Sequence, residues 1–431
     1  MPTLRRVRTI QGPLDAVVSV PGSKSIANRA LVCAALADGT SALTNVPDGD
    51  DTVAMLDCLR ALGSGPRIDA DRVTIGGSGG RIAPPGDDVV HAALAGTTSR
   101  FITAMAALGT GPISIDGHPP LRRRPFGPLH EALMQLGVEV TSWEQAGSLP
   151  VTIQGPPTGR DVTIRGDVSS QFISALMLIG PYLPNGLTLN LSTPLISRPY
   201  VEMTAAVLGW FGHTEIEIDD DRVTVAAGRY VAATRAIEPD ASSASYPLGL
   251  AAVLGGTVHV PGLGFGAIQG DSRFADLLAD MGCSVVRSDD GVWVGRDLDQ
   301  DIEGIDIDMA DISDLVPTVA VIAAFAASPT VIRGVGFIRA KESDRLGDLA
   351  AELRLAGVDI DETDDGLTIR PSRHRLHPGK LGTHHDHRLA MAFGVLGSVV
   401  DGIVVEDPDV VSKSWPDYWD MLDRVTGALD E

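Results

Sequence analysis

The chain repeats one pattern six times. In each copy a short polar segment precedes an Ala-rich apolar run, and a small-residue turn and a run of strand-forming residues follow. A pattern that recurs over most of a chain indicates one supersecondary unit used repeatedly. The six polar segments are Ser23–Ser25, Gly96–Arg100, Ser169–Gln171, Asp240–Ser243, Asp311–Asp314 and His385–Arg388.

A second element recurs between these segments, an amphipathic run that ends in glycine. The glycines are Gly63, Gly137, Gly212, Gly282 and Gly357, and subtracting successive numbers gives 74, 75, 70 and 75. Ser, Thr and Asp accept hydrogen bonds at helix starts, and Gly suits a left-handed helix end. Each unit is therefore predicted to be a capped, fully buried helix, a strand, an amphipathic helix and two further strands.

Six such units divide naturally into two similar domains of three. The last unit lacks closing strands, and the opening segment, residues 4–20, has strand character without a unit of its own. We expect this segment to complete the last unit, so that residues 1–20 and 238–431 form one domain and residues 21–237 an inserted second domain. The alternative is a single ring or solenoid of six units.

Composition limits the possible partners. The 431 residues carry a net charge of −22, which disfavours nucleic-acid and membrane binding but leaves a small anionic ligand possible. The three cysteines lie in apolar runs, as expected in a reducing compartment, and the first 20 residues contain no apolar stretch typical of a signal peptide. We therefore expect a cytoplasmic protein without a membrane span.

Cationic residues gather at the polar segments of different units. They are Lys24, Arg29, Arg100, Arg124, Arg345, Arg388 and Lys413. Such a set predicts a ligand with several anionic groups, either two phosphates or a phosphate with carboxylates. Asp314 lies among apolar residues and suits either a helix cap or a general base. The His-rich run at 384–388 offers side chains in different directions, so no metal site is expected.

Several short motifs stand in a specific order along the chain. They are Pro21–Ser25 with Asn28-Arg29, Leu94–Thr97, Leu121–Pro125, Ser169–Phe172, Ser197–Tyr200, Asp240–Tyr246, Lys341–Arg345, Asp386–Arg388 and Lys413–Tyr418. In this order and spacing the whole chain resembles the 5-enolpyruvylshikimate-3-phosphate synthase family of enolpyruvyl transferases. The resemblance implies an α/β fold of two similar domains, each with three βαβαββ repeats in an inside-out α/β barrel. It also implies an active site in the cleft between the domains.

The resemblance further implies a reaction and a set of site residues. The family transfers the enolpyruvyl group of phosphoenolpyruvate to the 5-hydroxyl of shikimate 3-phosphate and releases phosphate, in aromatic amino acid biosynthesis. Asp314, Glu342 and Lys24 would be catalytic. Shikimate 3-phosphate would contact Lys24, Ser25, Arg29, Ser169, Ser170, Gln171, Ser197, Asp314 and Lys341. Phosphoenolpyruvate would contact Lys24, Gly96, Arg124, Gln171, Arg345, Arg388 and Lys413.

The same resemblance implies no cofactor, no metal and a monomer. It implies sensitivity to glyphosate, since Ala95-Gly96 keeps the small residue that the family associates with it. The chain departs from the family at Phe337, where Asn is frequent, and at Phe101 and Arg198. Two alternatives stay open: a sister enolpyruvyl transferase acting on UDP-N-acetylglucosamine, and a non-catalytic scaffold of six repeats. The motif Lys24-Ser25 and the absence of a cysteine near Arg124 argue against the sister enzyme.

Overall fold

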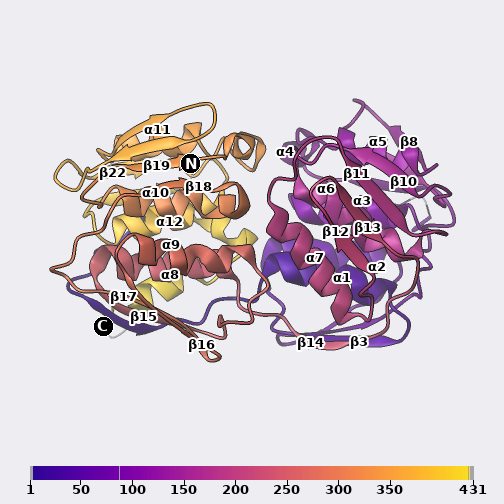
Figure 1. The fold of residues 1–431 in the computed structure, drawn as a ribbon, viewed down its shortest axis with the longest axis horizontal. Coiled ribbons are helices and arrows are strands. Elements are labelled where there is room, and N and C mark those ends of the chain that lie inside the picture. The colour runs from indigo at the N-terminus through magenta and orange to yellow at the C-terminus, as the bar shows by residue number, and fades with distance from the viewer. Residues whose placement is uncertain (1–2, 87, 426, 428–431) are drawn as a thin grey trace. The chain divides into compact units, whose positions relative to one another are not determined.

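The computed structural model describes residues 3–86, 88–425 and 427. Its chain divides into two compact units, one of residues 1–21 and 238–431 and one of residues 22–237 (Figure 1). We call these the terminal unit and the inserted unit. The chain passes from the terminal unit to the inserted unit after Pro21 and returns after Ile237.

The inserted unit contains three repeats. Its helices are α1 (Lys24–Leu36), α2 (Asp50–Ala61), α3 (Gly96–Ala106), α4 (Pro119–Arg122), α5 (Gly127–Gln135), α6 (Ser170–Ile179), η1 (Gly180–Tyr182) and α7 (Arg198–Trp210). Its strands are β3 (Thr40–Thr44), β4 (Arg67–Asp69), β5 (Arg72–Gly76), β6 (Val89–His91), β7 (Ile113–Asp116), β8 (Glu139–Ser142), β9 (Val151–Gln154), β10 (Asp161–Ile164), β11 (Leu187–Leu191), β12 (Ile216–Ile218), β13 (Arg222–Val225) and β14 (Thr234–Ala236).

The terminal unit contains the other three. Its helices are α8 (Ala241–Leu254), η2 (Gly270–Arg273), α9 (Phe274–Asp280), η3 (Ala310–Leu315), α10 (Val316–Ala323), η4 (Gly336–Ala340), α11 (Gly347–Leu355), α12 (His387–Gly397), η5 (Pro408–Lys413) and α13 (Tyr418–Val425). Its strands are β1 (Leu4–Arg6), β2 (Leu14–Val17), β15 (Gly256–Pro261), β16 (Ser284–Ser288), β17 (Gly291–Arg296), β18 (Asp306–Asp308), β19 (Thr330–Arg333), β20 (Asp359–Glu362), β21 (Leu367–Arg370), β22 (Gly379–Leu381) and β23 (Ile403–Glu406).

Each repeat forms its own small sheet. In the repeat of β10 to β13, for example, β10 pairs in parallel with β11 across the buried helix α6, and β13 and β12 continue the sheet in antiparallel pairs. Five sheets have four strands and one has three, and within the described residues none closes into a barrel. The repeats are therefore βαβαββ units with mixed sheets.

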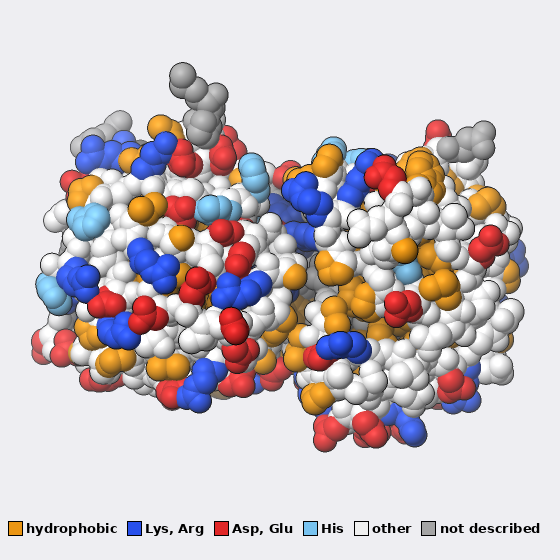
Figure 2. Space-filling model, turned by 90° about the horizontal axis from the view of Figure 1, so that it is seen from above, with side chains coloured by type: hydrophobic (Ala, Val, Ile, Leu, Met, Phe, Trp, Pro, Cys, Tyr) orange, Lys and Arg blue, Asp and Glu red, His pale blue; other side chains and the backbone are white. Residues whose placement is uncertain are grey.

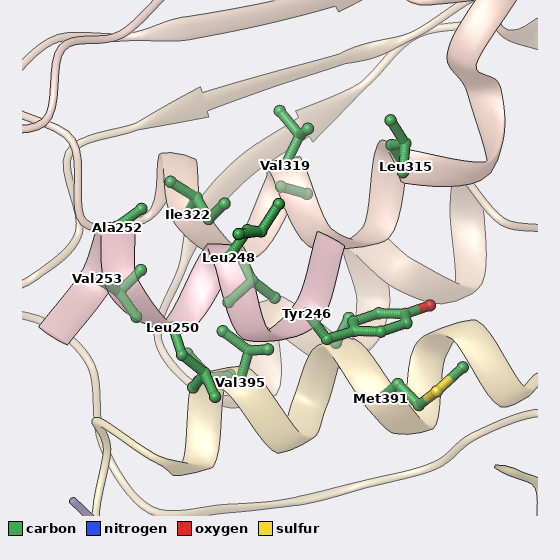
Figure 3. Close-up of a cluster of buried hydrophobic side chains, with 14 of the residues drawn as sticks. Tyr246, Leu248, Leu250, Ala252, Val253, Leu315, Val319, Ile322, Met391 and Val395 are labelled. Carbon is green, nitrogen blue, oxygen red and sulfur yellow. The ribbon is translucent and has the colours of Figure 1, made fainter. Parts of the chain in front are cut away.

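The buried helices form the core of each unit. In the terminal unit, α8, α10 and α12 pack against one another, with Leu250, Val319 and Val395 among the buried side chains (Figure 3). In the inserted unit α1, α3 and α6 do the same. These helices are buried along almost their whole length, and most of their side chains are apolar, as expected of helices surrounded by other elements. The sheets cover the helices, so the strands lie outside the helical core.

The expectation that the opening segment completes the last unit is correct for only one of its two strands. β1 pairs with β23 in the last repeat, but β2 pairs in parallel with β15 of the first repeat in the terminal unit. The physical reason is that β15 has an edge that no later strand covers, and the chain reaches it before crossing to the inserted unit. Both strands nevertheless hold the N-terminus in the terminal unit.

The predicted glycine helix ends are confirmed. Gly63, Gly137, Gly212, Gly282 and Gly357 all have φ between +81° and +97°. The predicted capping is confirmed at four of the six buried helices, where Ser23, Ser169, Asp240 and Asp386 accept hydrogen bonds from first-turn amides. It is wrong at α3, which follows Ala95, and at α10, where Asp314 lies in the preceding turn η3 instead.

Candidate functional site

The predicted site residues fall into two sets, one on each unit. The inserted unit carries Lys24, Ser25, Arg29, Gly96, Arg124, Ser169, Ser170, Gln171 and Ser197, all at or near helix starts. The terminal unit carries Asp314, Lys341, Glu342, Arg345, Arg388 and Lys413. Each set is described within its own unit.

Helix α1 presents Lys24 and Ser25 in its first turn. Ser23 caps the helix, and the Nζ of Lys24 lies 3.0 Å from Oδ2 of buried Asp51. Asp51 belongs to the first turn of α2, where a carboxylate is also favoured by the helix dipole. The sequence reasoning missed Asp51, although the pair Asp50-Asp51 before an apolar run is a recognisable helix start.

Arg29 is buried, with 1% of its surface exposed. Its Nε donates to Thr204 Oγ1 at 2.7 Å, its Nη1 to the Ser25 carbonyl at 2.7 Å and its Nη2 to Ser174 Oγ at 3.1 Å. Burial lowers the pKa of Arg29 to about 10, which still leaves the guanidinium charged at neutral pH. Arg29 thus braces Ser25 and joins α1 to α6 and α7.

Gly96 and Arg124 lie side by side. A Cβ on Gly96 would stand 2.5 Å from Arg124 Nη1, so a larger residue at this position would displace the end of the Arg124 side chain. Arg100 secures the arrangement, because its Nη1 donates to the Gly96 carbonyl at 2.9 Å and its Nη2 to the Pro125 carbonyl at 3.4 Å. Of the three successive arginines, Arg122 pairs with Asp116 instead, at 2.5 Å.

Helices α6 and α7 supply the serine and glutamine residues. Ser169 caps α6 and accepts a hydrogen bond from the Gln171 amide at 3.3 Å, which places Ser169, Ser170 and Gln171 in one turn. Ser197 precedes α7 with φ +53°, a left-handed conformation that is strained for serine. Polar side chains at two helix starts together suit an anionic or hydroxylated ligand.

In the terminal unit, Arg345 joins three carboxylates. Its Nη1 donates to Asp314 Oδ1 at 2.8 Å, its Nη2 to Glu342 Oε2 at 2.6 Å and its Nε to Asp386 Oδ2 at 2.6 Å. Burial opposes the charge of Arg345, but these three carboxylates outweigh it and raise its pKa above the ordinary value. Arg345 is therefore a permanently charged centre.

Asp314 lies between several cations. Arg388 Nη2 donates to its Oδ2 at 2.6 Å, and Lys341 Nζ stands 3.9 Å from its Oδ1. Burial would raise the pKa of Asp314, yet Arg388, Lys341 and Arg345 lower it well below the usual carboxylate range. Asp314 is thus ionised, as a proton acceptor must be. Lys341 also lies beside Phe337, with Nζ 5.9 Å from the ring centre.

The sequence predicts no separate role for Asp386, although this residue belongs to the motif Asp386–Arg388. Asp386 is fully buried, caps α12 through the Arg388 amide at 2.9 Å, and accepts from both Arg345 and Ser343.

The last predicted cation, Lys413, ends the turn η5 and is 8% exposed. Charges of both signs are interspersed on the face of the molecule that Figure 2 shows.

Two solved structures share this fold. The EPSP synthase of Acinetobacter baumannii superposes with a TM-score of 0.81 at 24% identity, covering 98% of both chains. The enolpyruvyl transferase NikO of Streptomyces tendae superposes with a TM-score of 0.77 at 18% identity, covering 98% of this chain and 97% of that one. The chain therefore has the enolpyruvyl transferase fold.

Sequence comparison identifies the family within this fold to which the chain belongs. The model of the family described as EPSP synthase (3-phosphoshikimate 1-carboxyvinyltransferase) matches residues 8–422. The 3-phosphoshikimate 1-carboxyvinyltransferase of Trichormus variabilis is 39% identical, covering 98% of this chain and 99% of its own. That of Methanosphaerula palustris is 40% identical, covering 95% and 97%. The chain belongs to the EPSP synthase family and is an enzyme, a transferase of aromatic amino acid biosynthesis.

This membership bears on the two alternatives. A non-catalytic scaffold and a UDP-N-acetylglucosamine enolpyruvyl transferase are both disfavoured, because the family match spans nearly the whole chain. None of the helices in the described part of the chain has the length and hydropathy that a membrane span requires.

Proposed function

We propose that the chain transfers the enolpyruvyl group of phosphoenolpyruvate to the 5-hydroxyl of shikimate 3-phosphate, and that residues of both units take part. The observation that carries the proposed roles is the pair of carboxylates, Asp314 and Glu342, bound to the one guanidinium of Arg345. An addition followed by an elimination needs two proton-transfer groups near an anion-binding centre. This arrangement supplies both within one unit.

Each substrate is assigned contacts from both sets of residues. Shikimate 3-phosphate contacts Lys24, Ser25, Arg29, Ser169, Ser170, Gln171, Ser197, Asp314 and Lys341. Phosphoenolpyruvate contacts Lys24, Gly96, Arg124, Gln171, Arg345, Arg388 and Lys413. In support, the guanidinium of Arg124 lies directly beside Gly96, and guanidinium groups match phosphate and carboxylate geometry. For Arg29 the support is indirect, since it holds the carbonyl of Ser25.

In the addition step, Asp314 accepts the proton of the 5-hydroxyl of shikimate 3-phosphate. The oxygen of that hydroxyl forms a bond to C2 of phosphoenolpyruvate. Glu342, together with Lys24, delivers a proton to the methylene carbon, which gives a tetrahedral ketal phosphate. Elimination then removes a proton from the new methyl group and expels phosphate. The same two groups work in opposite directions in the two steps, as microscopic reversibility allows.

The hydrogen bonds that Asp314 accepts make it a weak base. Arg345 and Arg388 both donate to it and lower its pKa. Anionic groups of phosphoenolpyruvate compete for those guanidinium groups, so their binding withdraws hydrogen bonds from Asp314 and raises its pKa. Phosphoenolpyruvate would in this way activate the base for its own reaction.

The remaining expectations concern the state of the enzyme. We propose a cytoplasmic monomer that needs no cofactor. Cytoplasmic location is supported by Cys33, Cys58 and Cys283, which are free and buried, as in proteins of reducing compartments. Size-exclusion chromatography with light scattering tests the monomer.

Phosphate release from phosphoenolpyruvate, measured with and without shikimate 3-phosphate, tests the proposed function. Asp314→Ala and Glu342→Ala are each expected to lower kcat by about 10²–10⁴-fold while the protein still binds shikimate 3-phosphate. Asp311→Ala, in the same turn but half-buried and paired with Arg273 instead of Arg345, is the matched control and keeps its activity. Full activity in either site variant removes that residue from the mechanism. Release that depends on UDP-N-acetylglucosamine instead refutes the substrate assignment.

A further inference from the structure

The two arginines that bind Asp314 depend on one turn of the chain. Asp386 accepts from Arg345 and also caps α12, the helix whose second residue is Arg388. The Asp386 amide in turn donates to the Thr383 carbonyl at 2.8 Å. A displacement of the turn 383–386 would therefore move both guanidinium groups.

The backbone of this turn is strained. His384 and His385 are consecutive and both left-handed, with φ +50° and +59°. Residues other than glycine adopt this conformation at a cost in free energy, and they keep it only where surrounding contacts impose it. A contact outside the turn must hold it in place.

Glu352 of helix α11 supplies that contact. Its Oε1 accepts from His384 Nε2 at 2.7 Å, and its Oε2 accepts from the Gly382 amide at 2.8 Å. The Glu352 carboxylate thus accepts hydrogen bonds from the residues on either side of Thr383. Asp348, one turn earlier on α11, lies 3.6 Å from His384 Nδ1. Glu352 is 8% exposed, so its carboxylate is largely shielded from water, whereas His384 lies at the surface.

The contacts close a ring within the terminal unit. Arg345 lies two residues before α11. The preceding residue, Asp344, accepts hydrogen bonds from the Leu346 and Gly347 amides at the start of that helix and so fixes this segment to it. The ring then runs along α11 to Glu352, through His384 and the strained turn to Asp386, and back to Arg345. A rigid helix and a fixed turn together set the position of the guanidinium.

We propose that Glu352 and His384 form a clasp that positions Arg345 and Arg388 for phosphoenolpyruvate. They are positioning residues, because neither touches the reacting atoms in this scheme. The inference rests on the proposed role of the two arginines in binding that substrate. Loosening the clasp weakens phosphoenolpyruvate binding and leaves shikimate 3-phosphate binding nearly unchanged, since most contacts proposed for shikimate 3-phosphate belong to the inserted unit.

The experiment measures KM for each substrate separately, with kcat and Tm, in the full-length enzyme. His384→Ala and Glu352→Ala are each expected to raise KM for phosphoenolpyruvate on the order of tenfold, because each removes a hydrogen bond to a charged group. KM for shikimate 3-phosphate stays within about twofold. Exposed His374 of the same unit gives the control His374→Ala, which changes neither constant.

Two conservative variants separate positioning from a loss of structure. In Glu352→Gln the amide oxygen still accepts from Gly382, and in His384→Gln the amide nitrogen reaches the position of His384 Nε2 and still donates to Glu352. Both are expected to restore KM for phosphoenolpyruvate to within about threefold of the parent value. A lower Tm with both KM values raised equally would show a purely structural role and overturn the proposal.

Arg345→Lys distinguishes failure of the clasp from failure of the proposed function. If Arg345→Lys raises KM for phosphoenolpyruvate while His384→Ala and Glu352→Ala do not, the clasp is refuted and the role of Arg345 stands. If Arg345→Lys also leaves that KM unchanged, the role of Arg345 is wrong and the clasp proposal falls with it. Should Glu352→Ala fail to fold, His384→Ala at the partly exposed position decides alone.

Discussion

The buried carboxyl of Asp271 lies beside the start of helix α8, where it is hydrogen-bonded to Ser242 Oγ. Burial raises the pKa of Asp271 to about 7, and the charge of Asp314 adds to the effect. The neighbouring carboxylate Asp314 is shifted in the opposite direction, because it has arginine partners. Two aspartates of one unit thus differ in protonation because of their surroundings rather than their chemistry.

This shift predicts a pH-dependent stability. The folded pKa of about 7 exceeds the unfolded value of about 3.9, so the stabilisation is complete below pH 4 and is lost as pH rises through 7. Asp271→Asn stays neutral and keeps a partner for Ser242. It is expected to raise the free energy of unfolding at pH 8 by at least about 1 kcal/mol relative to the parent, with the gain vanishing toward pH 4.

Urea unfolding at pH 4, 6 and 8 measures this effect. Asp280→Asn, an exposed position on the neighbouring helix α9, is the control and should show no such pH trend. A gain in Asp271→Asn that is equal at all three pH values would contradict the assigned cause.

At the scale of elements, the start of each buried helix determines what it contributes to the site. Ser23 and Ser169 cap their helices and so place Lys24 and Gln171 in the first turn. The turn η3 before α10 contains Ile312 in a non-helical conformation. Asp314 lies in this turn and does not cap α10; its carboxylate accepts hydrogen bonds from Arg345 and Arg388 instead. The departure from the common pattern is therefore what supplies the proposed base.

The start of α1 also depends on close packing of the main chain. A Cβ on Gly22 would lie 1.9 Å from the Asn45 carbonyl oxygen, and a backbone atom cannot move aside as a flexible side chain does. Gly22→Ala is expected to lower the free energy of unfolding by about 1–3 kcal/mol, as overpacking does, and to raise KM for both substrates by displacing Lys24.

Thermal unfolding and steady-state kinetics measure the Gly22→Ala variant. Gly76→Ala is the matched control, because a Cβ at Gly76 meets nothing within 4 Å. An unchanged Tm in Gly22→Ala would show that the chain before α1 can move away from Asn45 at little cost.

At the scale of the whole molecule, the inserted unit leaves and returns at neighbouring points. The Asp240 amide donates to the Pro21 carbonyl at 2.8 Å, so the two crossings are joined within the terminal unit. The buried helices α1, α3 and α6 of the inserted unit pack on one another. This organisation is typical of domains that fold independently.

Residues 22–237 expressed alone are therefore expected to unfold in one cooperative transition. The fragment should show no phosphate release, because Asp314 and Glu342 belong to the other unit. Circular dichroism during heating and the phosphate assay check the two claims. The counterpart, residues 1–21 joined to 238–431 by a short Gly-Ser linker, is the control for expression. A non-cooperative melt of the fragment would show that the inserted unit needs the terminal unit to fold.

The sequence predicted most of the fold because its signals are local. Helix caps, terminal glycines and fully apolar helices are set by hydrogen bonding and burial within a few residues, and they recur at a nearly constant spacing. The destination of β2 escaped prediction, because pairing with β15 depends on an open strand edge more than 200 residues away along the chain.

The features of the site likewise divide into those that the sequence determined and those that depend on tertiary contacts. Motif order by itself determined the family and the identity of the charged residues, since those features are one-dimensional. Only the tertiary structure decided that Asp314 is held by two arginines, that Arg29 braces Ser25, and that Glu352 and His384 hold the turn before Asp386. Charge interaction depends on distance and on burial, and neither quantity is defined until the repeats have packed.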